Sequence, residues 1–97
     1  MINKEIRISD KLVFNPWQKN GEYWVRYIKN HWRTDSYFNS RVEISPFPIF
    51  RRIRFYYGIK HLNNLFNHKI YENPDIEIIK EDIDQFLIKI SKLQSFI

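Results

Sequence analysis

The chain has 97 residues, of which 16 are lysine or arginine and 11 are aspartate or glutamate, so its net charge is +5 with neutral histidines. A chain of this length forms one domain and is too short for a TIM barrel, a complete dinucleotide-binding fold or a protein kinase. It contains no cysteine, which excludes disulfides, thiolate zinc sites and thiol nucleophiles. We expect a single domain over residues 1–97, β-rich in residues 1–45 and helical in residues 46–97.

The sequence contains no apolar stretch that approaches the roughly 20 residues of a membrane-spanning helix. The first five residues are not followed by the apolar run of a signal peptide. A cysteine-free chain stabilised by its core suits the reducing cytoplasm. We therefore predict a cytoplasmic protein that does not associate with a membrane.

The charge is distributed unevenly along the chain. Residues 1–71 contain 13 Lys+Arg and 5 Asp+Glu, a net charge of +8, whereas residues 72–97 contain 3 and 6, a net charge of −3. A basic body attracts polyanions and accelerates encounter with them. The same charge also serves ordinary solubility.

The first 45 residues have the apolar and polar alternation of short antiparallel strands. The Asn20-Gly21 pair indicates a hairpin, because both residues tolerate the positive φ of a type I′ turn. Residues 33–36 indicate a further turn. The predicted strands cover residues 6–8, 12–14, 23–28 and 41–44.

A helix in residues 15–32 is the alternative to this hairpin. It would begin at Asn15-Pro16, with Gln18 completing a capping box and Trp17, Trp24 and Ile28 roughly on one face. Glycine at position 21 would cost such a helix about 1 kcal/mol relative to alanine. This alternative would make the protein an all-α bundle. The strand-forming residues of 22–28 favour the hairpin.

Residues 49–57 fit either a helix or a strand. A helix over about 47–68 would be apolar on two sides or would bend near Gly58. A strand would alternate imperfectly, with Ile53 and Phe55 on one face and Arg52 and Arg54 on the other. The prolines at 46 and 48 break the chain before either element. We favour the helix, since one buried between layers can be apolar on more than one side.

A second helix is predicted over about 74–95. Asn73 is suited to cap it, Pro74 suits the first helical position, and the acidic residues gather early where the helix dipole favours them. A short strand at 76–79, with the helix starting at Glu81, is the alternative. The fold class is therefore α+β, an N-terminal antiparallel sheet followed by two C-terminal helices.

The apolar residues of this last helix follow heptad spacing and form one continuous stripe. Packing on its own domain is favoured over pairing with a second copy, because the sheet must be covered. The residues of this seam are Ile76, Ile79, Ile83, Phe86, Ile90 and Leu93.

The sequence lacks the motifs of the common catalytic and metal sites. His31, His61 and His68 match no compact ligand spacing. No serine is flanked by glycine, and two glycines cannot build a phosphate-binding loop. We therefore expect no catalytic residue, no bound metal and no cofactor.

Basic and aromatic residues cluster between positions 50 and 61. On a strand, Arg52, Arg54 and Tyr56 would form a cationic, aromatic platform. On a helix, Arg51, Arg54 and His61 would form one polar stripe. Alternatively, these arginines form a solvated rim beside the core and bind no partner. The candidate residues for binding a partner or nucleic acid are Arg51, Arg52, Arg54, Tyr56, Lys60, His61, Trp24 and Arg26.

These features suggest a small non-catalytic binding protein. The leading hypothesis is an inhibitor or adaptor that docks on a nucleic-acid-processing protein or nucleoprotein complex, since Trp, Tyr and Arg anchor protein interfaces. Such proteins are often of this size, which is compatible with a phage or mobile-element origin. The alternatives are direct, sequence-independent binding of DNA or RNA and a small metal-independent ribonuclease of the toxin type.

Overall fold

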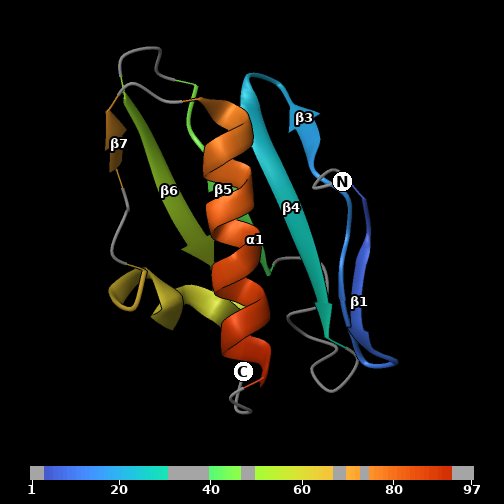
Figure 1. Cartoon of the computed structure of the whole chain (residues 1–97). Coiled ribbons are helices and arrows are strands. Elements are labelled where there is room, and N and C mark those ends of the chain that lie inside the picture. Colours follow the sequence, from blue (N-terminus) through green and yellow to red (C-terminus); the bar gives the residue numbers. More distant parts are fainter. Residues whose placement is uncertain (1–3, 31–39, 47–49, 67–69, 73–74, 93–97) are drawn as a thin grey trace.

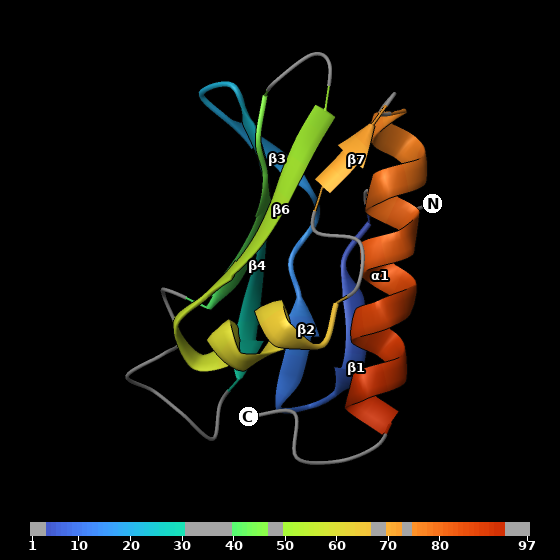
Figure 2. The same cartoon turned by 90° about the vertical axis from the view of Figure 1, so that its left-hand side faces the viewer.

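The computed structural model describes residues 4–30, 40–46, 50–66, 70–72 and 75–92. The chain begins with six strands, which are followed by a 3₁₀ helix, a seventh strand and a long α-helix. The long helix lies across one face of the sheet (Figures 1 and 2). The elements are β1 (Ile6–Ser9), β2 (Leu12–Phe14), β3 (Gln18–Asn20), β4 (Tyr23–Asn30), β5 (Arg41–Ile44), β6 (Phe50–Tyr56), η2 (Tyr57–Asn64), β7 (Ile70–Glu72) and α1 (Ile76–Lys92).

The strands of the described residues form one antiparallel sheet in the order β1-β2-β4-β5-β6-β7, with β3 paired to β4. This arrangement confirms the predicted α+β class, an antiparallel sheet followed by a C-terminal helix, over the all-α bundle. The predicted turn at 33–36 lies outside the described residues. No helix in the described part of the chain is long and apolar enough to cross a membrane.

The predicted hairpin is confirmed, with its loop one residue later than expected. Asn20 pairs with Tyr23, so the two loop residues are Gly21 and Glu22. Gly21 has φ +65°, a conformation that costs a residue with a side chain more than it costs glycine. The alternative helix across residues 15–32 is wrong, because residues 18–20 and 23–30 are strands.

The prediction of a helix over about 47–68 is wrong in its first half, where residues 50–56 form strand β6. Residues 53–56 of this strand pair with β5 and residues 50–52 pair with β7, which supplies partners for much of its backbone. Ile53 and Phe55 are buried, whereas Arg52 and Arg54 are exposed, so the strand alternation of this segment holds. Residues 57–64 form the 3₁₀ helix η2, which bends at Ile59 (φ −117°, ψ 21°).

The predicted last helix is confirmed as α1, and it begins at Ile76 without a preceding strand over 76–79. Asp75 caps it, because its Oδ1 accepts a hydrogen bond of 3.0 Å from the Glu77 amide. The proposed cap Asn73, and Leu93 at the far end of the stripe, lie outside the described residues. Lys89 and Lys92 lie in the last turn, where the helix dipole favours cations.

The core lies between the sheet and α1. Helix residues Ile79, Ile83 and Leu87 are buried there, and Ile76, Phe86 and Ile90 pack partly buried beside them. The described part of the seam therefore packs on its own domain. Burying each large apolar side chain contributes roughly 1.5–3 kcal/mol. The buried sheet and η2 residues that meet this helix include Phe14, Ile28, Val42, Ile44, Ile53, Phe55, Ile59 and Leu62.

Candidate functional site

The sheet face opposite α1 carries charged and aromatic side chains on β5 and β6. Strand register sets Arg41 beside Tyr56 and Glu43 beside Arg54, while the intervening residues Val42 and Phe55 point into the core. Antiparallel sheets commonly pack one face on a core and leave the other to solvent. We call this surface the outer face, defined by Arg41, Glu43, Arg52, Arg54 and Tyr56.

Arg41, Glu43 and Tyr56 contact one another on the outer face. Arg41 Nε donates a hydrogen bond of 2.7 Å to Glu43 Oε2, and the Arg41 guanidinium lies 4.1 Å from the centre of the Tyr56 ring. Partial burial and the nearby Glu43 charge raise the pKa of the Tyr56 hydroxyl, although its contact with Arg54 opposes this. Tyr56 is therefore a neutral phenol at physiological pH.

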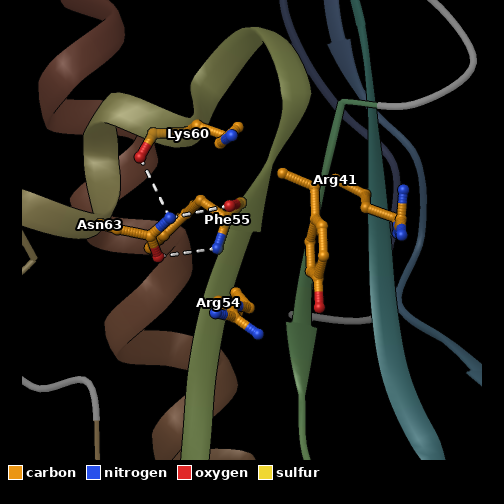
Figure 3. A pocket seen from close by; sticks show the side chains of 6 residues that line it. Arg41, Arg54, Phe55, Lys60 and Asn63 are labelled. Atoms are coloured by element: carbon orange, nitrogen blue, oxygen red, sulfur yellow. Dashed lines mark hydrogen bonds between the residues drawn. The ribbon is translucent and has the colours of Figure 1, made fainter.

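The 3₁₀ helix η2 is fastened to β6 by one asparagine. Asn63 Oδ1 accepts a hydrogen bond of 3.0 Å from the Phe55 amide, and Asn63 Nδ2 donates one of 2.8 Å to the Phe55 carbonyl (Figure 3). The same Nδ2 donates to the Lys60 carbonyl at 3.0 Å. The side-chain amide thus pairs with the strand backbone as a neighbouring strand would.

A pocket of about 460 Å³ opens where η2 follows β6. Arg41 comes from β5, Arg54 from β6, and Lys60 and Asn63 from η2 (Figure 3). Among the residues that the structure describes, no carboxylate lies within 4 Å of the cationic groups of Arg54 or Lys60. The pocket is lined by Arg41, Arg54, Phe55, Tyr56, Lys60 and Asn63.

The structure brings together three of the predicted binding residues, namely Arg54, Tyr56 and Lys60, in this pocket. Arg52 is exposed on the same side of β6, and His61 is exposed on η2. Arg51 points to the other side of the strand, where its Nη1 donates a hydrogen bond of 3.1 Å to the Ser45 carbonyl.

Trp24 and Arg26 do not belong to the outer face, because the β4 register places them on the side of α1. Lys80 Nζ lies 3.4 Å from the centre of the Trp24 ring and 3.4 Å from Glu77 Oε2, and the Lys80 side chain is buried. Such a cation–π contact is stronger when the cation is shielded from water. Trp24 therefore helps to hold α1 on the sheet.

Arg26 is fully buried and forms an ion pair with Asp84 of α1. Its Nη1 donates a hydrogen bond of 2.6 Å to the Asn15 carbonyl, and its Nη2 donates one of 3.1 Å to the Lys4 carbonyl. Arg26 Nε lies 3.0 Å from Asp84 Oδ1 without hydrogen-bond alignment, so this attraction is mainly Coulombic. Arg26 is accordingly placed in the interior, away from any surface that a partner would contact.

Trp17 completes this buried cluster. Its Nε1 donates a hydrogen bond of 3.1 Å to Asp84 Oδ1, and its ring centre lies 5.6 Å from the Arg26 guanidinium carbon. Burial raises the pKa of the Asp84 carboxyl to about 6, although the Arg26 charge and the Trp17 hydrogen bond oppose that shift. We call Trp17, Arg26 and Asp84 the buried cluster.

Sequence reasoning missed Arg41 and Asn63, which line the pocket, and Glu43, which accepts a hydrogen bond from Arg41. The alternation of Arg41-Val42-Glu43-Ile44 marked a strand, and only pairing with β6 brings its polar face beside Arg54 and Tyr56. Within the described residues, no group of three or more His, Asp or Glu could hold a metal ion. Comparison of the chain with protein-family models, curated proteins and solved structures gives no match.

Proposed function

We propose that this chain is a non-catalytic, cytoplasmic binding protein that docks through its outer face on a nucleic-acid-processing protein or nucleoprotein complex. The observation that carries the proposal is that Arg54 and Lys60 line one pocket and that, among the described residues, no carboxylate lies within 4 Å of either cationic group. Such cations attract an acidic partner and can pair with it. Arg52, which is exposed on the same side of β6, adds a further positive charge to the outer face.

Docking on a protein surface is favoured over stacking of nucleic-acid bases. A base-stacking platform needs an open aromatic ring face. The Arg41 guanidinium lies against the Tyr56 ring, and Glu43 places a negative charge in the middle of the face. Mixed charge of this kind is common at protein interfaces, whereas Glu43 would repel a phosphate backbone that follows β5.

Affinity capture with charge-reversed variants tests this proposal. The tagged protein is incubated with nuclease-treated extract, and the double variant Arg52→Glu, Arg54→Glu is compared with Lys89→Glu, Lys92→Glu. The control pair carries the same charge change on exposed positions of α1. We expect one stoichiometric partner that the control retains and the outer-face variant loses.

Two results would contradict docking on a protein. If both double variants capture the partner equally well, the outer face does not take part in the interaction. Loss of all bound material after nuclease treatment would instead support direct binding of DNA or RNA. Such binding should weaken steeply between 50 and 200 mM salt, by a factor on the order of 10³–10⁵ if about six to ten phosphates are contacted.

Metal-independent cleavage of RNA is a second candidate, favoured by the content of the pocket. Arg41, Arg54 and Lys60 can stabilise charge on phosphorus, and neutral Tyr56 can donate a proton. Glu43, which is hydrogen-bonded to Arg41, can accept a proton. Incubation of RNA with the purified protein and with Tyr56→Phe tests it. Cleavage that the variant loses by at least a hundredfold would support catalysis, and intact RNA would exclude it.

A further inference from the structure

The pocket on the outer face has the charge of a site for a doubly charged anion. Arg41, Arg54 and Lys60 supply three positive charges, and Glu43, hydrogen-bonded to Arg41, removes one, leaving a net charge of +2. The neutral Tyr56 phenol leaves this charge unchanged. A phosphate monoester carries about −1.5 to −2 at neutral pH and therefore balances it better than a carboxylate or a phosphodiester.

Contacts within the outer face hold Arg41 in place before any ligand arrives. Glu43 accepts a hydrogen bond of 2.7 Å from Arg41 Nε, and the Arg41 guanidinium lies 4.1 Å from the centre of the Tyr56 ring. Arg41 is thus held between a carboxylate and an aromatic ring. Binding then requires less ordering of flexible side chains, which otherwise reduces affinity.

The backbone that carries Lys60 is also fixed. Asn63 bonds both polar groups of the Phe55 backbone and the Lys60 carbonyl, so η2 keeps its position at the end of β6 (Figure 3). These three hydrogen bonds occupy the Asn63 amide, which therefore positions η2 and leaves recognition of the anion to Arg54 and Lys60. A planar guanidinium beside an ammonium group is suited to phosphate oxygens.

The pocket is larger than a phosphate group needs. Its volume of about 460 Å³ lies within the range of roughly 300–1,000 Å³ that small-molecule sites occupy. The additional space is bordered by Arg54, which is exposed, and by the half-buried Tyr56, whose ring has the Arg41 guanidinium against one face. Arg41 can therefore occupy only one face of the ring, and a single nucleotide base needs no more than one aromatic face or guanidinium plane on which to stack.

From this charge, volume and arrangement we infer that the pocket binds the terminal phosphate monoester of a nucleotide, with Arg54 and Lys60 as the phosphate ligands. The inference rests on the proposed function in that it uses the same outer face, and it adds the chemistry of the group that enters the pocket. The nucleotide is either free or at the phosphorylated end of a strand in a nucleoprotein complex.

Calorimetric titration of the purified full chain at low salt tests the inference with adenosine 5′-monophosphate as the probe and adenosine as the control. We expect the monophosphate to bind at least tenfold more tightly than adenosine. Arg54→Gln and Lys60→Gln should each weaken it by roughly tenfold or more, since each removes a hydrogen-bonded charge. Lys89→Gln on α1 should leave binding unchanged, and thermal unfolding of each variant verifies its fold.

Two further probes identify the source and class of the phosphate. A dinucleotide with a 5′-phosphate should bind more tightly than the same dinucleotide without one if strand ends are recognised, and only the mononucleotide should bind if the free form is the ligand. Phosphotyrosine that binds as tightly as the mononucleotide would overturn the nucleotide assignment. Equal binding of adenosine and its monophosphate, no binding at millimolar concentration, or equal loss in Lys89→Gln would overturn the site.

The result can be separated from a failure of the proposed function. If the nucleotide does not bind but the captured partner is still lost from Arg52→Glu, Arg54→Glu, the docking face stands and the phosphate site is wrong. If the nucleotide binds and no partner is captured, the phosphate site stands and docking on a protein is wrong.

Discussion

Arginine serves opposite purposes in the buried cluster and on the outer face. Arg26 is fully buried between the sheet and α1, where Asp84 and two backbone carbonyls surround it. Arg54 is exposed on β6 beside a pocket, with no carboxylate partner in the described residues. A buried charge is costly unless it is paired, whereas an exposed one costs little and remains available for a ligand. Strand register therefore decides which arginine stabilises the fold and which can bind.

The largest effect is expected when one member of the buried pair is removed. Asp84→Ala leaves the Arg26 charge buried without its partner and should lower the free energy of unfolding by roughly 3–5 kcal/mol. The double variant Arg26→Met, Asp84→Leu removes both charges and should recover most of this loss. Urea unfolding measures both, and a single variant as stable as the wild type would contradict the assignment.

The pH dependence of stability follows from the same carboxyl. The pKa of Asp84 is raised to about 6 in the folded state, above the value of about 3.9 in an unfolded chain. Between these values the folded state binds more protons, so the Asp84 contribution to stability falls as the pH rises from about 4 to 6. The full change is on the order of 3 kcal/mol, and it is constant above about pH 7.

This pH effect is isolated by comparison with Asp84→Asn, which cannot ionise. The difference in unfolding free energy between the wild type and Asp84→Asn should shift against the wild type from pH 4 to pH 6. Arg26, Lys80 and Trp17 surround the side chain at position 84 in both proteins, so the pH dependence of the rest of the chain largely cancels in the difference. A difference that stays constant, or that shifts in favour of the wild type, would show that the folded pKa is not raised.

A smaller structural effect is expected at the edge of the outer face. Asn63→Ala leaves the Phe55 amide and carbonyl without their side-chain partner and should cost about 1–3 kcal/mol. It should also weaken nucleotide binding, because η2 no longer holds Lys60 in place. Thermal unfolding together with calorimetry of Asn63→Ala tests the two consequences, and Asn64→Ala on the exposed side of η2 is the control.

The smallest change in stability is expected for the outer-face cations. Arg54→Gln and Lys60→Gln should alter the free energy of unfolding by less than about 0.5 kcal/mol, since both side chains are exposed. They should nevertheless produce the larger losses of binding. A destabilisation of several kcal/mol would place Arg54 with Arg26 as a structural residue and remove the contrast between the two regions.

Local pattern was sufficient to predict several elements. The Asn20-Gly21 signal, the alternation at 41–44 and the apolar period of the last helix each depend on near neighbours in the sequence. Residues 50–56 were different, because their alternation was incomplete and their strand state depends on pairing with β5 and β7. Tertiary pairing decided between two local choices that the sequence left nearly equal.

The buried face of α1 explains why Asp84 was missed. The predicted stripe followed the apolar residues, whereas the buried helix residues are Ile79, Lys80, Ile83, Asp84 and Leu87. In the sequence alone, the charged residues Lys80 and Asp84 are typical of the solvent-exposed side of a helix. Each is satisfied by a β4 residue, Trp24 for Lys80 and Arg26 for Asp84, and such a match between distant segments is visible only once the register is known.

The affinity of the purified partner for three forms of the protein shows whether the outer face is the binding surface. The forms are the wild type, Arg54→Glu and Lys89→Glu, which place the same charge change on opposite sides of the sheet and helix layers. We predict that Arg54→Glu weakens binding at least tenfold and that Lys89→Glu binds as the wild type does. Equal affinities for all three, or a loss confined to Lys89→Glu, would contradict the account.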